Sequence, residues 1–125
     1  MEMPYVMADY RFFLHPMRWT SLGLALCEAM MVGMPILGVA ATELPTVIRN
    51  GESGFIETDP ARLAEHGRRL LADQGEARRL GACAREVAME RFGIERFARD
   101  WEAVFESVTG RASDTAQIAA AAGGV

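Results

Sequence analysis

The sequence contains no lysine, because all thirteen of its basic residues are arginine. Chemistry that needs a lysine amine, such as a Schiff base or a lysine phosphate clamp, cannot come from these residues. The net charge of −4 leaves no basic footprint for nucleic acid. The arginines between residues 62 and 99 alternate with acidic residues, a pattern that predicts solvated helix faces.

The sequence has only two cysteines, Cys27 and Cys83, and neither belongs to a zinc or disulfide spacing. Long apolar runs are also missing. Glu28 interrupts the longest one, and Gly33 and Pro35 break its second half, so we expect no transmembrane segment. The opening "MEMPYVMADY" lacks the basic residues and apolar core of a signal peptide. We therefore expect a cytoplasmic protein.

The first half of the chain reads as strand, helix, strand. "RFFLHP" (11–16) and "PILGVA" (35–40) are short apolar runs typical of buried parallel strands. Between them, Thr20 and Ser21 can both cap a helix that ends at Gly33, nearly apolar all round and therefore covered on most faces. With a third strand at "GFIET" (54–58), the pattern predicts an α/β fold of about three parallel strands with flanking helices.

The second half predicts a C-terminal helical segment. Asp59 caps a first helix that begins at Pro60, with Leu63, Leu70 and Leu71 on one face. A second helix over about 76–92 turns a set of apolar residues inward: Leu80, Ala84, Val87 and Ala88.

A third helix begins near Ile94 and carries an apolar stripe that we interpret as core packing. The stripe consists of Ile94, Phe97, Trp101, Val104, Phe105 and Val108. From Gly110 onward the sequence is small, polar and low in complexity, which predicts a flexible tail over 110–125.

The turn "RWTSLG" is the candidate ligand site. In a βαβ unit, ligands bind beyond the carboxyl ends of the strands, where a helix N-terminus offers unpaired N–H groups. Thr20 and Ser21 supply hydroxyls, and Gly23 leaves room for a phosphate beside the amides of Leu22 to Leu24. These features fit a diphosphate cradle, although many helix caps with this pattern bind nothing.

Glu28 lies about two turns into the same apolar helix. An unpaired carboxylate would be costly to bury there, so it needs a partner. The vicinal hydroxyls of a ribose would suit it, since a carboxylate accepts two hydrogen bonds. The alternatives are that Glu28 reaches solvent or pairs with an arginine.

The stretch "LHPMRWTSLGLALCEAMMVGMPILGVAATELPTVIRNGESGFIETDPARL" resembles the donor-binding part of retaining glycosyltransferases with the GT-B fold, the group-1 or family-4 class. The resemblance is carried by "CEAMMVGMPI" and "NGESGF" at the right separation, and it runs without a gap from Phe12 to Phe55. It implies a partial Rossmann-like domain over residues 1–109, the C-terminal half of a nucleotide-sugar-binding domain.

The resemblance assigns roles to particular residues. Glu28 matches the second glutamate of the family's Glu-x7-Glu motif, which holds the nucleotide ribose. Leu22, Gly23 and Leu24 match the residues whose amides meet the donor diphosphate, and Ser21 precedes them. No metal or cofactor is implied beyond the nucleotide-sugar donor itself.

The sequence departs from the family pattern at two places. Thr20 stands where the family has its first glutamate, which touches the donor sugar, so the identity of that sugar is in doubt. Thr42 and Glu43 stand where the family often has two glycines; Glu43 is either a displaced donor-contacting acid or a solvent-facing loop residue. Arg18 flanks the cradle and either contacts phosphate or is a surface arginine, whereas His15 reads as a satisfied histidine.

The implied reaction is retaining transfer of a hexosyl group from a nucleotide sugar to an unknown acceptor. The resemblance does not extend to an acceptor domain, so we expect the chain alone to be inactive. We also expect it to need that N-terminal domain or to self-associate through an exposed apolar sheet edge. The alternatives are a non-catalytic interaction module, a truncated paralogue, and a fragment of a sugar-nucleotide epimerase.

Overall fold

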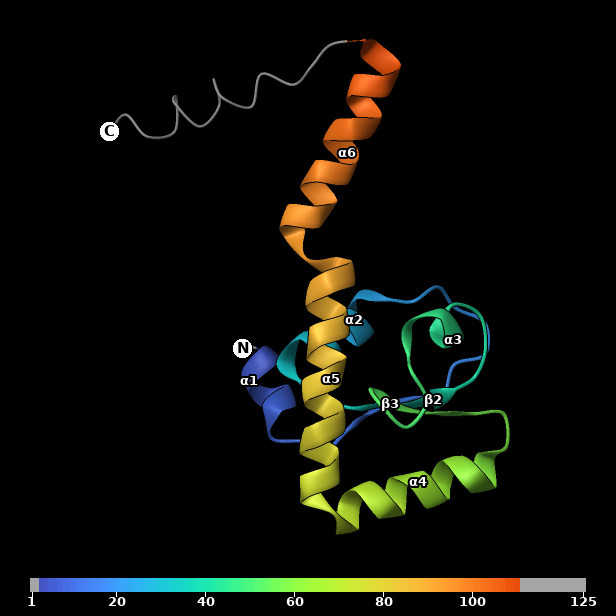
Figure 1. Cartoon of the computed structure of the whole chain (residues 1–125). Coiled ribbons are helices and arrows are strands. Elements are labelled where there is room, and N and C mark those ends of the chain that lie inside the picture. Colours follow the sequence, from blue (N-terminus) through green and yellow to red (C-terminus); the bar gives the residue numbers. More distant parts are fainter. Residues whose placement is uncertain (1–2, 111–125) are drawn as a thin grey trace. The chain divides into compact units, whose positions relative to one another are not determined.

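The computed structural model of the chain describes residues 3–110, in nine elements coloured along the chain in Figure 1. Their order and bounds are α1 (Met3–Ala8), β1 (Phe13–His15), α2 (Leu24–Val32), β2 (Ile36–Val39), α3 (Leu44–Val47), β3 (Gly54–Glu57), α4 (Pro60–Ala72), α5 (Gln74–Phe92) and α6 (Ile94–Thr109). The chain divides into two compact units, one that ends at Phe92 and one that begins at Gly93.

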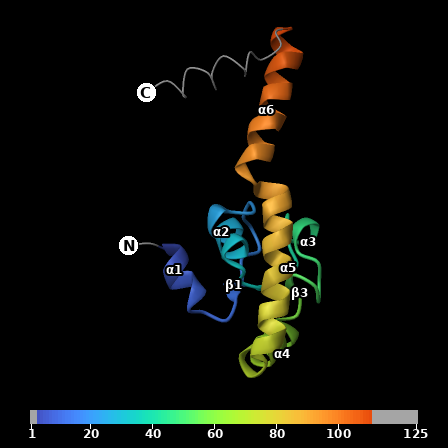
Figure 2. The ribbon, with the colours of Figure 1, turned by 60° about the vertical axis from the view of Figure 1, so that its left-hand side comes forward.

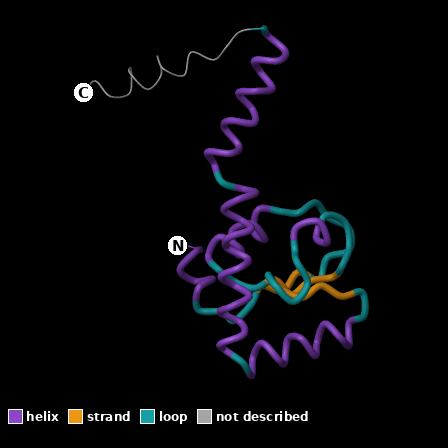
Figure 3. Tube along the Cα trace, in the orientation of Figure 1, coloured by secondary structure: helices purple, strands orange, loops and turns teal. Residues whose placement is uncertain are grey.

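The three strands form one parallel sheet in the order β1-β2-β3, drawn in orange in Figure 3. Leu37 of β2 lies opposite Leu14 on one side and opposite Phe55 on the other. This confirms the α/β fold and the three strands predicted from the sequence. β1 is an edge strand of the described sheet, and its Leu14 is about half exposed.

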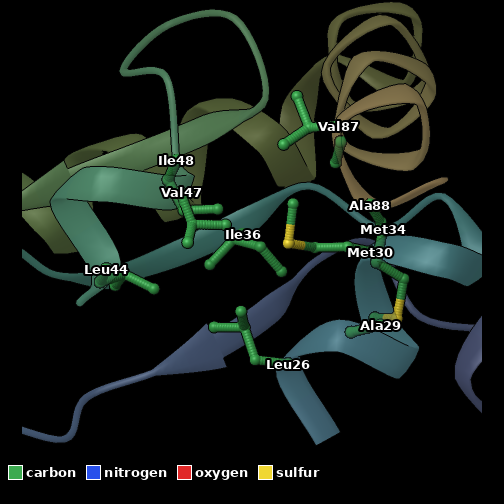
Figure 4. Close-up of a cluster of buried hydrophobic side chains, with 11 residues drawn as sticks. Leu26, Ala29, Met30, Met34, Ile36, Leu44, Val47, Ile48, Val87 and Ala88 are labelled. Carbon is green, nitrogen blue, oxygen red and sulfur yellow. The ribbon is translucent and has the colours of Figure 1, made fainter. Parts of the chain in front are cut away.

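Successive residues of β2 serve the two faces of the sheet, as strand geometry requires. Ile36 belongs to a core cluster with residues of α2, α3 and the second half of α5, part of which is shown in Figure 4. Leu37 belongs to a second cluster with residues of α4 and the first half of α5. Figure 1 shows α4 below the strands and α2 and α3 above them.

The helix α4 begins as predicted. Pro60 is its first residue, and the Asp59 carboxylate accepts a hydrogen bond from the amide of Ala61 at 2.8 Å. Leu63 and Leu70 are buried, but Leu71 is 62% exposed, so placing it on the apolar face was wrong. Residues 70 and 71 differ by about 100° around the helix, which carries Leu71 off the buried face.

The helices α2 and α5 run side by side, as Figures 1 and 2 both show. All four residues predicted for the inner face of α5 are buried. Gly33 ends α2 in the left-handed conformation, with φ 89°. A Cβ on Gly81 of α5 would lie 1.9 Å from the Gly33 carbonyl oxygen. Glycine at position 81 is therefore what lets the two backbones meet.

The helix α6 belongs to the unit that begins at Gly93, and this unit is described by itself. The six residues of its apolar stripe are between 47% and 79% exposed, and no residue of the helix is buried. The sequence pattern identified the helix and its apolar face, but it did not reveal whether that face is covered.

Two short elements, α1 and α3, were not predicted at all. The predicted tail over 110–125 falls almost wholly outside the described residues. Within residues 3–110, no helix is long and apolar enough to cross a bilayer. Cys27 and Cys83 are free thiols, both partly buried.

Candidate functional site

A cavity of about 400 Å³ lies beyond the carboxyl ends of β2 and β3. Its wall combines loop residues that follow all three strands, because parallel strands end at the same edge of a sheet. Arg18 and Trp19 come from the loop after β1, residues 39–42 from the end of β2, and Thr58 from the residue after β3. The Trp19 side chain is 91% exposed.

The start of α2 differs from the prediction. Neither Thr20 nor Ser21 caps the helix, because α2 begins at Leu24 with Gly23 at the N-cap and has no side-chain cap bond. Gly23 adopts φ 77°, a conformation open to glycine, and a Cβ there would approach only the Ser21 carbonyl oxygen, at 3.9 Å. The first amides of α2 therefore lack both a helical and a side-chain partner, beside a solvent-accessible glycine.

Glu28 is exposed, and within residues 3–110 its carboxylate makes no hydrogen bond or ion pair. Of the alternatives that the sequence left open for Glu28, the structure shows the one in which the carboxylate reaches solvent. Only one side of α2 is buried, by Leu26, Ala29 and Met30. Leu24, one turn before Glu28 and on the same side of the helix, is 82% exposed. The carboxylate is thus open to a ligand and stabilises nothing that the structure describes.

The cavity contains some of the predicted site residues and not others. Arg18 lines it, whereas Thr20, Glu28 and residues 21–24 are not part of its wall. Glu43 is not part of the wall either. It is exposed at the N-cap of α3, where the Thr46 hydroxyl donates to its backbone carbonyl at 2.8 Å and lies 3.3 Å from its carboxylate. This supports reading Glu43 as a solvent-facing loop residue.

Thr42 lines the cavity with its backbone in the left-handed region, at φ 50°. It is the only residue other than glycine with a positive φ in the described chain. A β-branched side chain is disfavoured there by roughly 1–2 kcal/mol. The family often has glycine at position 42. Glycine would adopt this left-handed backbone conformation without strain, whereas Thr42 does not.

Sequence reasoning did not single out Trp19 or Thr58 as site residues. The available signal was topological: Trp19 follows the first strand and Thr58 ends the third predicted strand. Glu57, the residue before Thr58, is not a candidate ligand group, because its carboxylate already has two partners. It lies 3.1 Å from Arg62 and 3.2 Å from His66. No group of three or more His, Cys, Asp or Glu side chains in the described part of the chain could hold a metal ion.

His15 is the last residue of β1 and lies opposite Gly38. Burial lowers the pKa of its imidazole, which favours the neutral ring near neutral pH. The ring stacks with Phe13, at 6.3 Å between centroids. These contacts fit the structural role expected for His15.

Three parallel strands, a glycine-capped helix after β1 and a cavity at the carboxyl edge define part of a Rossmann-like domain. Residues 1–87 match the model of the family described as "Glycosyl transferases group 1", and the chain belongs to this family. The GT-B resemblance noted in the sequence is confirmed.

Among curated relatives, the chain is similar to the N-acetyl-alpha-D-glucosaminyl L-malate synthase of Bacillus anthracis. The two are 33% identical over 90 residues, which is 70% of this chain and 24% of the relative. It is also 39% identical over 80 residues to the D-inositol 3-phosphate glycosyltransferase of Streptomyces bingchenggensis (strain BCW-1), covering 62% of this chain and 17% of the relative. The chain spans about a quarter or less of the length of these relatives.

Among solved structures, the chain is similar to the sucrose-phosphate synthase from Thermosynechococcus elongatus. The TM-score is 0.77 at 26% identity, over 84% of this chain and 27% of the other. This agreement places the three strands and their helices within the GT-B architecture. The chemistry named for this family is glycosyl transfer.

Proposed function

We propose that the chain is the donor side of a glycosyltransferase and binds the nucleotide sugar from which a hexosyl group is transferred. The observation that carries this proposal is the exposed, unpartnered carboxylate of Glu28, one turn after the open start of α2. A carboxylate on a solvent-accessible helix face, next to free amides, suits a molecule that has both hydroxyls and phosphates.

Each part of the site has a role in this proposal. The carboxylate of Glu28 accepts hydrogen bonds from the two ribose hydroxyls. The backbone from Ser21 to Leu24 receives the diphosphate, where the exposed glycine at position 23 allows close approach. Arg18 and Thr20 lie on the sugar side, where Arg18 contributes positive charge to the cavity wall.

A protein with a similar fold has been solved with the nucleotide UDP bound. The TarM protein of S. aureus was solved with UDP bound, and the chain matches its fold with a TM-score of 0.73 at 19% identity, over 78% of this chain and 20% of that one. Such a likeness concerns the fold. The base of the nucleotide therefore has to be found by titration.

Transfer also needs an acceptor site, which we assign to a partner. We propose that the chain alone transfers no sugar and that β1 is the edge at which an N-terminal acceptor-bearing part, or a second copy of the chain, joins it. A coupled assay that detects sugar transfer by the pure chain would contradict the first statement. Sedimentation as a clean monomer at about tens of micromolar would contradict self-association.

A non-catalytic interaction module is the second candidate. The exposed apolar stripe of α6 favours it, as does Thr20 in place of an acid. This candidate predicts that nucleoside diphosphates do not bind.

The proposal is tested by recording amide NMR spectra of the chain during titration with UDP, GDP and ADP. One of the three should give saturable shifts that are largest at the amides of Gly23, Leu24 and their neighbours. Saturable shifts confined to other surfaces would contradict the assignment of the diphosphate to the start of α2. A complete lack of saturable shifts would favour the interaction module.

A further inference from the structure

Arg11, just before β1, has a buried charged nitrogen without a partner. Its Nη1 atom is shielded from solvent and makes no hydrogen bond within the described residues. A guanidinium offers five N–H donors, and leaving a buried donor of a charged group unpaired is costly. Such an atom calls for an occupant such as a water or an ion.

A cavity of about 260 Å³ adjoins this arginine. Its wall comes from the segment before β1, the end of α2 and the start of α5, and it includes Asp9, Tyr10, Arg11, Gly33, Gln74 and Arg78. These segments meet at the amino ends of the strands. The cavity therefore lies at the opposite end of the sheet from the cavity around Trp19 and Thr42.

The wall carries a net positive charge. Arg78 is exposed and, like Arg11, has no ion pair within residues 3–110. Against these two guanidinium groups stands one acid, Asp9, which forms no ion pair with either of them in the described structure. The start of α5 adds no free charge to the wall, because the Asp73 carboxylate already accepts a hydrogen bond from the amide of Glu76 at 2.9 Å.

Three carbonyl groups at the end of α2 each accept a hydrogen bond from another group, and none is bonded to Nη1 of Arg11. The carbonyl of Met30 accepts the amide of Gly33 at 2.9 Å, and that of Ala29 accepts the amide of Met34 at 2.9 Å. The carbonyl of Met31 accepts a hydrogen bond from Arg85. Nη1 of Arg11 is thus left without a partner in the described structure.

We propose that this cavity is a second binding site, for an oxyanion of the phosphate class, held between the guanidinium groups of Arg11 and Arg78. Planar guanidinium groups bind phosphate oxygens through paired, charge-assisted hydrogen bonds. The Arg11 side chain turns toward the anion so that its Nη1, now shielded, gains a partner, and the exposed Arg78 side chain closes over the opening. The site is independent of the proposed nucleotide site, and free phosphate and the phosphate of a larger molecule share this chemistry.

The test uses the full chain and inorganic phosphate at constant ionic strength, and it follows the arginine Nε–H and backbone amide signals by NMR. Saturable shifts should appear at Arg11, Arg78 and the first turn of α5. Arg11→Gln and Arg78→Gln should each weaken phosphate binding at least about tenfold. Arg68→Gln is the matched control, since Arg68 is exposed on α4 and unpaired in the described structure, and it should leave binding unchanged.

Several results would overturn the proposal. Shifts that grow without saturation, or that are as strong in Arg78→Gln as in the wild type, would show non-specific screening. Equal affinity for acetate would show that the site takes carboxylates. Because Arg78 is exposed, its variant keeps the test decisive even if Arg11→Gln fails to fold.

Two further arms separate the sources of the phosphate and the two sites. A sugar phosphate that binds much more tightly than inorganic phosphate would identify a phosphorylated metabolite as the occupant, whereas equal affinity would identify free phosphate. Glu28→Ala should leave phosphate binding at Arg11 intact. Loss of phosphate binding in that variant would contradict the independence of the two sites.

Discussion

Arg18 and Thr42 line one cavity, although they belong to loops that follow different strands. Both side chains therefore lie on the wall of the cavity that we propose for the sugar. Arg18 supplies charge, and Thr42 shapes the wall at the cost of a left-handed backbone.

The strain at Thr42 leads to a stability prediction. Thr42→Gly should be more stable than Thr42→Ala by about 1 kcal/mol, because only glycine adopts φ near 50° without a Cβ clash. In an ordinary loop the order is reversed, since glycine gains more freedom in the unfolded chain. Urea unfolding of the two variants measures the difference. An alanine variant as stable as the glycine variant would show that the position is unstrained.

The contact between Gly81 and Gly33 leads to a second prediction. Gly81→Ala should lower the free energy of unfolding by about 1–3 kcal/mol, because its Cβ meets a backbone carbonyl that cannot move without separating α2 from α5. Gly75→Ala in the same helix is the control. Its nearest neighbour is Oδ1 of Asp73 at 3.3 Å, which accepts the amide of Glu76 and has to give by only a few tenths of an ångström, so the cost there should be smaller. Equal costs at both positions would rule out the close helix contact as the cause.

Trp19 should report on the sugar. Trp101→Phe leaves Trp19 as the sole tryptophan, and its emission should change more with a nucleotide sugar than with the matching nucleoside diphosphate, because the hexose ring enters the cavity that Trp19 lines. In the reciprocal variant, Trp19→Phe, the remaining Trp101 should show no change. Identical responses to the diphosphate and its sugar conjugate would remove Trp19 from the sugar site.

The lowered pKa of His15 predicts how stability depends on pH. Below its usual pKa of about 6.5, the unfolded chain binds a proton that the folded chain resists, so this group makes stability fall as the pH drops through that value. His15→Asn should flatten that part of the stability profile and leave the profile above neutral pH unchanged. Urea midpoints measured across this range test it, and an unchanged slope in the variant would refute the role given to His15.

The sequence predicted the local parts of the fold well. The strands, the Asp59 cap of α4 and the buried face of α5 depend on nearby residues and on the helical or strand period, which a sequence displays directly. Whether a face is covered depends on partners elsewhere in the chain. For that reason Leu71 was misread as buried, and α2 was expected to be covered on most faces although only one side of it is buried.

The candidate site was predicted in part for the same reason. The family resemblance identified the loop after β1 and the residue Glu28. It could not reveal that Gly23 caps α2 in place of Thr20 or Ser21, because the cap depends on the path of the loop. Trp19, Thr42 and Thr58 line the same cavity because the sheet register brings together segments that are distant in the sequence.

The most direct test of the central claim is a calorimetric comparison of nucleoside diphosphate binding by the wild type, Glu28→Ala and Glu86→Ala. Glu86 is an exposed helical acid without a partner in the described structure, so its variant controls for the loss of one negative charge. If Glu28 holds the ribose, Glu28→Ala should weaken binding at least about tenfold, while Glu86→Ala binds like the wild type. Equal affinities for all three proteins would contradict the assignment of Glu28 to the donor nucleotide.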